Sequence, residues 1–247
     1  MRLNQINISR TSNMHIYCIN LERRRDRRQK IQHELDREEL EDVEFFSGTD
    51  GCRHSRLNKG QCGCVDSHIR VWRDIVHKGH PVSLVLEDDA RLVSHFRDQL
   101  DDVMKNMPID WDYVNLGSIP SQRITQEHLT SEIIKGFSTT THCYLISLKA
   151  ARHLSHWETK NVQYDIDMQI TRSPLNMYFT QKPLATQNIQ GWPVLGFVTS
   201  ALDGDLGLFR KSAIDFDWFV KTQWKSVSIF FVLYFICIRI QKSGLLF

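Results

Sequence analysis

Short apolar runs along the chain predict β-strands, and polar or glycine-containing segments separate them. The runs are rich in Val, Ile, Leu and aromatic residues, which is typical of buried strands bounded by turns. They lie at 15–19, 43–46, 82–86, 111–117, 142–146 and 177–179.

Amphipathic stretches between these strands predict helices. The first is expected to start near Arg27, because Asp26 and Gln29 have the spacing of a capping box. The second is expected over 64–78, with Gly79 as a natural C-terminal stop. Two more are expected over 96–107 and after Ser147 as N-cap. The alternation of strands and helices predicts an α/β fold, with a mostly parallel central sheet and helices on both faces.

Differences in polarity divide the rest of the chain. We expect a leader over 1–13, a folded domain over 14–200, a linker over 201–226 and an apolar tail over 227–247. Inside the domain, the polar residues of 52–60 and 118–135 predict loops.

The apolar tail has three interpretations. Its apolar run over 227–238 is shorter than the roughly 20 residues that cross a bilayer. Trp218 and Trp224 before it favour a membrane-surface helix or a marginal, thinned span. A buried packing helix and an incidental extension stay open. No charged and apolar leader precedes the first strand, so we expect no signal peptide and a cytoplasmic or membrane-associated location.

The composition is that of a folded protein. The 247 residues are 41% hydrophobic and 24% charged, which excludes general disorder. Lys and Arg number 31 against 29 Asp and Glu, a net charge of +2, so a nucleic-acid partner is not expected. Functional charge must therefore be sought locally.

Cysteine spacing suggests mostly free thiols, because no CxxC pair occurs and a chain of this length needs no staples. The cysteines are Cys18, Cys52, Cys62, Cys64, Cys143 and Cys237. A zinc site of Cys62 and Cys64 with His54 and His68 is the alternative, but Cys-Gly-Cys is not the usual knuckle spacing.

Three consecutive acids, Glu87, Asp88 and Asp89, end the predicted strand 82–86. Carboxylates packed this closely repel each other, and a cation among them relieves the repulsion. Glu87 and Asp89 are two apart on an extended backbone and should point the same way. Hard oxygen ligands suit Mg²⁺ or Mn²⁺ holding a phosphate. The alternative is an ordinary solvated junction between strand and loop.

An arginine-rich loop, Asn20 to Arg28, follows the first strand and leads into a helix. Cations at a helix N-terminus oppose the helix dipole, and a bound anion would explain them. A solvated basic surface is the usual interpretation of such a charge run, whereas a strand, a short basic loop and a helix N-terminus together make a geometry that accepts phosphate. In parallel sheets ligands gather at the carboxyl ends of the strands. This loop and the acids from Glu87 to Asp89 should both lie there.

Three further residues have both functional and ordinary interpretations. Asp165 and Asp167 form a second carboxylate pair, or are two surface acids. His68 lies beside the apolar stripe of helix 64–78, where a core-edge histidine bonded to the backbone is expected more often than a ligand.

The sequence resembles glycosyltransferase family 25, which includes lipooligosaccharide and collagen galactosyltransferases. The similar segments, in the family's order, are Ile19-Asn20-Leu21-Glu22-Arg23 with Asp26-Arg27, Asp50-Gly51, Gly60 with Gly63-Cys64, Ser67-His68 and Trp72, Leu84 to Ala90, Asp112 to Gly117, His142 to Ser147 with Ala150, and Asp165. The resemblance covers about 14–190. Arg25 replaces the family's Pro in the opening loop, which adds charge.

The resemblance implies a GT-A type fold, a UDP-sugar donor (most often UDP-galactose), Mn²⁺ or Mg²⁺, and inversion at the anomeric carbon. Glu87 and Asp89 would hold the metal, and Asp165 or Asp167 would be the catalytic base. The donor nucleotide would lie against Asn20, Arg23, Arg27, Asp50, Ser67, His68 and Asp88.

The implied partners are the UDP-sugar, a hydroxyl-bearing acceptor and, through the tail, a membrane surface. The first alternative is a catalytically silent, membrane-tethered binding protein, although nothing in the acidic triplet looks degenerate. The second is a metal-dependent phosphohydrolase, for which no second ligand cluster with His is evident.

Overall fold

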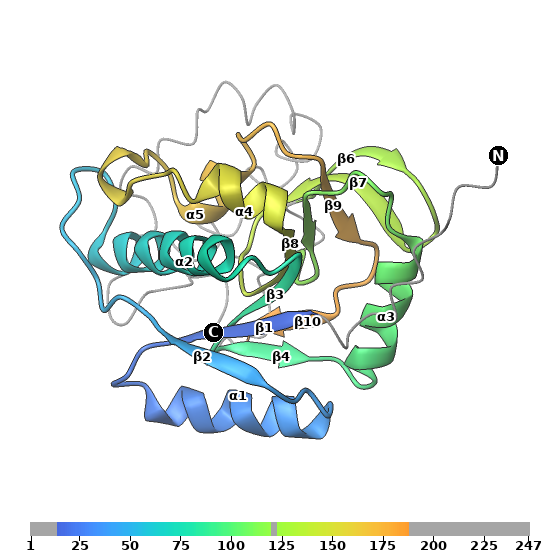
Figure 1. Ribbon diagram of the computed structural model, residues 1–247, viewed down its shortest axis with the longest axis horizontal. Coiled ribbons are helices and arrows are strands. Elements are labelled where there is room, and N and C mark those ends of the chain that lie inside the picture. Colours follow the sequence, from blue (N-terminus) through green and yellow to red (C-terminus); the bar gives the residue numbers. More distant parts are fainter. Residues whose placement is uncertain (1–13, 120–122, 188–247) are drawn as a thin grey trace, which may run out of the picture. The chain divides into compact units, whose positions relative to one another are not determined.

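The computed structural model describes residues 14–119 and 123–187 (Figure 1). The expected leader 1–13, linker 201–226 and tail 227–247 lie outside these residues, and so do Cys237 and residues 188–200 of the expected domain; these expectations stay predictions. Among the described helices, none has both the length and the apolarity needed to cross a membrane.

A central sheet carries eight strands in the order β2-β1-β3-β8-β5-β9-β7-β6. The strands are β1 His15–Asn20, β2 Val43–Ser47, β3 Val82–Glu87, β5 Tyr113–Asn115, β6 Arg123–His128, β7 Ile133–Ser138, β8 Cys143–Ser147 and β9 Met177–Thr180. Within the described chain, six of these strands run in one direction, and only β7 and β8 run against them. The predicted α/β class and mostly parallel strand direction are confirmed.

Helices cover both faces of the sheet, which gives three layers (Figure 1). On one face lie α1 Arg25–Arg37 and α3 Phe96–Asn106, and on the other α2 Lys59–Lys78, α4 Leu148–Leu154 and α5 Ile166–Ile170. Strand β1 contributes side chains to the core on both faces of the sheet. Ile16 and Cys18 pack toward α1, and Tyr17 and Ile19 pack toward α2. This alternation follows from the two-residue period of a strand.

The helix boundaries were predicted well at two caps and poorly at two starts. Gly79 ends α2 in the left-handed conformation with φ 72°, and the Ser147 hydroxyl accepts the Ala150 N–H, as expected. However, α2 begins earlier than predicted, because Asn58 and Gln61 form its capping box. The end of the expected 52–60 loop is therefore helical.

The expected capping box at the start of α1 is wrong. Arg24 is the N-cap, without a side-chain cap, and Asp26 lies in the first turn. The Asp26 carboxylate is paired instead with the Arg24 guanidinium at 2.9 Å. An acid in the first turn is still favourable, because it opposes the partial positive charge of the helix N-terminus.

The predicted loop 118–135 is also wrong, because 123–138 contains the hairpin β6–β7. Strand β6 forms one edge of the sheet and is mostly exposed, so its sequence shows no apolar alternation. Strand β6 is held in the sheet by its pairing with β7, which in turn pairs with β9. A second small sheet, also not predicted, pairs β4 Ala90–Leu92 with β10 Ala185–Gln187.

Helix α1 holds the segment after β3 through two buried acids. Glu34 pairs with Arg91 at 2.9 Å and accepts the Leu92 N–H at 3.1 Å. Glu38 accepts the Phe96 N–H at 2.8 Å. These bonds attach β4 and the start of α3 to α1, and so they fix the segment that leaves the acidic triplet.

The expectation of mostly free thiols needs one correction. Cys52 and Cys62 form a disulfide that ties the segment after β2 to the first turn of α2. Cys18, Cys64 and Cys143 are free. Since Cys62 is oxidised, the four-residue zinc site considered above cannot form.

Candidate active site

The carboxyl ends of three parallel strands meet at one edge of the sheet. Asn20 at the end of β1 pairs in register with Ser47 of β2, and Ile19 pairs with Glu87 of β3. The arginine loop after β1 and the acids after β3 are therefore neighbours, as the sequence predicts.

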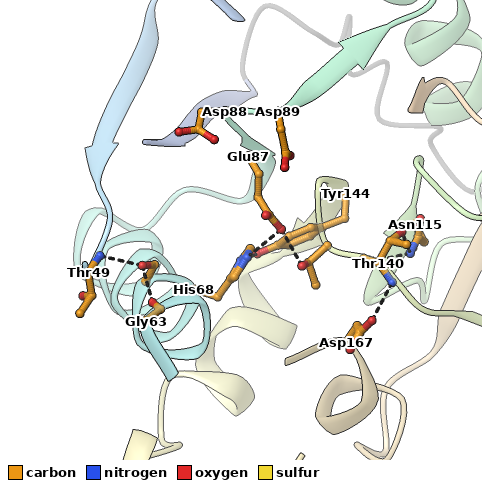
Figure 2. A network of polar contacts seen from close by, with 12 residues as sticks. Thr49, Gly63, His68, Glu87, Asp88, Asp89, Asn115, Thr140, Tyr144 and Asp167 are labelled. Atoms are coloured by element: carbon orange, nitrogen blue, oxygen red, sulfur yellow. Dashed lines mark hydrogen bonds and ion pairs between the residues drawn. The ribbon is translucent and has the colours of Figure 1, made fainter. Parts of the chain in front are cut away.

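Asp88 joins this arginine loop to the acids. Its carboxylate accepts Asn20 Nδ2 at 2.7 Å and Arg27 Nη1 at 3.1 Å. Burial raises the pKa of Asp88, and these two donors only partly oppose the rise. Asp88 is thus held in place by the loop, and its side chain points away from those of Glu87 and Asp89 (Figure 2).

Glu87 is held by a buried chain of hydrogen bonds. Thr141 Oγ1 donates to Glu87 Oε1 at 2.6 Å, and His68 Nε2 lies 3.3 Å from the same oxygen (Figure 2). Burial by itself raises the pKa of Glu87, but the hydrogen bonds from His68 and Thr141 hold it below the usual range. The Glu87 carboxylate is therefore ionised.

His68 lies between Glu87 and the core. Its Nδ1 is 2.9 Å from the Tyr144 hydroxyl, which also accepts Trp72 Nε1–H at 3.0 Å. Each group is satisfied if Trp72 donates to Tyr144, Tyr144 donates to His68 Nδ1, and His68 Nε2–H donates to Glu87. The expected backbone partner for His68 is wrong, because the buried ring contacts two side chains, one of them in the acidic triplet.

Asp89 is the least compensated acid of the triplet. Burial, and then the charge of Glu87, raise the pKa of Asp89, and Arg27 at 3.5 Å opposes this only in part. Its buried Oδ1 has no hydrogen-bond partner in the described chain. An orphaned carboxylate oxygen beside an ionised Glu87 fits a divalent cation with oxygen ligands. The predicted metal pair therefore has a donor set suited to Mg²⁺ or Mn²⁺.

The second carboxylate pair lies at the start of α5. Asp167 accepts the N–H groups of Thr140 at 3.1 Å and Met168 at 2.7 Å, and Asp165 is the N-cap residue. Burial, and then the charge of Asp167, raise the pKa of Asp165 to about 6. Neither acid is the freely solvated surface residue of the ordinary interpretation.

A threonine loop before β8, which the sequence reasoning missed, links the two acid groups. The Thr141 hydroxyl donates to Glu87, and the backbone N–H of the adjacent Thr140 donates to Asp167. Thr140 is a β-branched residue at φ 85°, and Asn115 Nδ2 holds its carbonyl at 2.9 Å. Strained backbone of this kind gathers at functional sites. The only signal in the sequence was a run of hydroxyl residues directly before a strand.

The remaining predicted residues, Arg23, Asp50 and Ser67, make contacts with the loops after β1 and β2. Arg23 pairs with Asp50 at 2.8 Å, and both side chains are exposed. The Ser67 hydroxyl accepts the Thr49 N–H at 2.8 Å and donates to the Gly63 carbonyl at 2.6 Å. Ser67 therefore positions the loop after β2 against α2.

The electrostatics bring both acid pairs to one place. The charges of Glu87, Asp167, Asp89 and Asp165, after burial, raise the pKa of the Cys64 thiol well above its usual range. All four carboxylates therefore lie near one residue of α2.

Comparison with known proteins finds similarity to one family of glycosyltransferases. Residues 13–131 match the family model described as glycosyltransferase family 25 (LPS biosynthesis protein). Procollagen galactosyltransferase 1 of Danio rerio is 27% identical over 85% of this chain and 40% of its own length. A probable inactive glycosyltransferase 25 family member 3 of Rattus norvegicus is 35% identical over 40% of this chain and 18% of its own. The chain thus spans less than half of either relative.

Two solved structures are more distantly similar. One is a glycosyltransferase involved in glycosylation of the major capsid of PBCV-1, with TM-score 0.36 and 6% identity, covering 57% of this chain and 63% of its own. The other is a mannose-1-phosphate geranyltransferase from Thermus thermophilus, with TM-score 0.37 and 9% identity, covering 68% and 73%. The family match spans the arginine loop, the whole of α2 and the acidic triplet, so over these residues this chain is similar to glycosyltransferase family 25.

Proposed function

We propose that this chain is a metal-dependent glycosyltransferase of GT-A type. It transfers a sugar, which we propose is galactose, from a UDP-sugar to a hydroxyl of a glycan, glycolipid or protein acceptor, with inversion at the anomeric carbon. The family match and the procollagen galactosyltransferase relative support the reaction class and the sugar. The observation that carries the proposal is the linkage of two acid groups, Glu87 and Asp167, by one strained loop.

Glu87 and Asp89 would hold the divalent cation, which supplies positive charge to the departing nucleoside diphosphate. Glu87 enters this role already ionised, because His68 and Thr141 stabilise its charge. Asn20 and Arg27 bind the Asp88 carboxylate, and these bonds would keep Asp88 out of the metal position and align the loop toward the phosphates.

Asp165 is the better candidate for the base that takes the acceptor proton. The Asp167 carboxylate is occupied by two backbone N–H groups, and Asp165 makes no cap bond with its side chain. A base works best when its pKa is near the working pH, and that of Asp165 is raised to about 6. Asp167 is then a positioning residue that shapes the Thr140 loop.

The test is a panel of nucleotide sugars and hydroxyl acceptors, with Mn²⁺ and after chelation. We expect turnover with UDP-galactose only in the presence of the metal. The Asp165→Asn variant should lose roughly 10²- to 10⁴-fold in kcat while keeping its affinity for UDP. The exposed Asp98→Asn variant on α3 is the matched control. Undiminished turnover in chelator would refute the proposal.

A silent binding protein is the second candidate, because some relatives are called inactive in their names. It predicts UDP binding without turnover for any donor in the panel. Binding alone does not separate the two candidates, whereas sugar transfer does.

A further inference from the structure

Cys64 has no part in the proposed transfer, yet its thiol lies beside Glu87 and His68. Its thiol belongs to a compact group with His68 and Glu87, and one ligand atom from each lies within 4.8 Å of the others. His68 is buried, and Cys64 and Glu87 are half-buried. In the described part of the chain, only this group brings a sulfur, a nitrogen and an oxygen ligand together.

The backbone presents these ligands in an arrangement suited to a metal. Cys64 and His68 are four residues apart on α2, so they lie on one face, one turn apart. Glu87 comes to the same face from the end of β3. A helical pair at this spacing with a third ligand from another element is the arrangement found in helical zinc sites.

The measured separation also fits. His68 Nε2 and Glu87 Oε1 are 3.3 Å apart. Tetrahedral Zn²⁺, with Zn–N and Zn–O bonds of about 2.0–2.1 Å, separates two such ligand atoms by about 3.3 Å. The nitrogen and oxygen are therefore already at the spacing of one tetrahedral edge, and the Cys64 thiol lies within 4.8 Å of both.

We propose that Cys64, His68 and Glu87 form a Zn²⁺ site, with the fourth position open. A thiolate and an imidazole favour Zn²⁺ over the harder Mg²⁺ and Mn²⁺, which prefer the oxygens of Asp89. Three protein ligands and one open position are typical of catalytic zinc sites, whereas structural zinc sites have four protein ligands. This site is distinct from the metal of the proposed function, although the two share Glu87.

Binding of Zn²⁺ displaces protons from two of the ligands. Zn²⁺ takes the lone pair of His68 Nε2, and the ring proton moves from Nε2 to Nδ1 by exchange with solvent. The Tyr144 hydroxyl hydrogen, which points at Nδ1 without zinc, rotates away, and Nδ1–H then donates to the Tyr144 oxygen, a partner of the kind that orients most metal-binding histidines. The Cys64 thiol loses its proton to solvent, so each Zn²⁺ bound releases one proton and no redox step occurs.

The first test is titration of the full chain with Co²⁺ and Zn²⁺ in buffer without reductant, so that the Cys52–Cys62 disulfide stays closed. We expect one equivalent of Co²⁺ to give a near-ultraviolet sulfur-to-cobalt charge-transfer band. In Cys64→Ala the band should disappear, and Zn²⁺ affinity should fall at least about tenfold. Cys143→Ala, another free thiol in the core, should leave both unchanged.

The second test uses the unaltered protein, and so does not depend on the folding of a variant. Zn²⁺ should slow alkylation of Cys64 by iodoacetamide, measured by peptide mass spectrometry, and Mg²⁺ should not. A cobalt complex without the sulfur band, or equal alkylation rates with and without Zn²⁺, would overturn the site. Neither readout involves sugar transfer, so a failure here is separate from a failure of the proposed function.

Discussion

Replacing Glu34 should loosen the segment that follows the acidic triplet. Its buried carboxylate accepts Arg91 at 2.9 Å, Arg37 at 2.9 Å and the Leu92 N–H at 3.1 Å. Glu34→Ala removes all three bonds at once, and β4 loses part of its attachment to α1. No other residue in the described chain links α1 to both Arg91 and the Leu92 N–H.

The cost can be worked out bond by bond. The Leu92 N–H is buried, and leaving it without an acceptor costs about 1–3 kcal/mol. The side chains of Arg37 and Arg91 are 39% and 33% exposed, so water takes up much of their charge. Each arginine then loses only the roughly 0–1 kcal/mol of a surface pair. Glu34→Ala should therefore destabilise the fold by about 1–5 kcal/mol, and Glu34→Gln, which keeps an acceptor oxygen, by less.

Urea unfolding followed by circular dichroism measures this loss of stability. The unfolding midpoint falls, and the dependence of the free energy on urea concentration stays unchanged. The exposed Glu41→Gln is the matched control and should stay within about 0.5 kcal/mol of the parent. Hydrogen exchange at the Leu92 amide should quicken in Glu34→Ala. If Glu34→Ala unfolds at the same urea concentration as Glu41→Gln, the assignment of Glu34 as the link between α1 and β4 is wrong.

Three further predictions concern the loop after β2 and the second acid pair. A Cβ on Gly63 would lie 2.6 Å from the Gly51 nitrogen, so Gly63→Ala should lower the free energy of unfolding by about 1–3 kcal/mol. Thermal melts measure the change, and an unchanged melting temperature would refute this contact. Opening the Cys52–Cys62 disulfide, which closes a short loop, should lower the free energy of unfolding by about 3 kcal/mol at most. Peptide mapping without reductant should find the two cysteines linked, and free thiols at both would contradict the pairing. Asp165 has a folded pKa raised to about 6, so ionisation destabilises the fold as pH rises through that value. Asp165→Asn should therefore be more stable than the parent at pH 8, by about 1 kcal/mol after solvent screening, and the gain should vanish below the ordinary Asp pKa; a gain independent of pH would contradict it.

The sequence by itself determined the layers and the convergence of the first two functional segments. Period-two alternation in β1 and helical spacing in α2 are local properties, and they assign each side chain to a face before any packing occurs. Because parallel strands end at a common edge, the order β1, α1, β2, α2, β3 was enough to bring Asn20 and Glu87 together.

Tertiary structure decided what each polar group does there. Strand β6 is an edge strand whose order comes from β7, so its polar sequence looked like a loop. Likewise, the partners of His68 are Tyr144 and Glu87, which are 76 and 19 residues away along the chain. Burial and neighbouring charge set the ionisation of a carboxylate, and both arise only when distant segments meet; spacing could therefore identify the acids but not assign their separate roles.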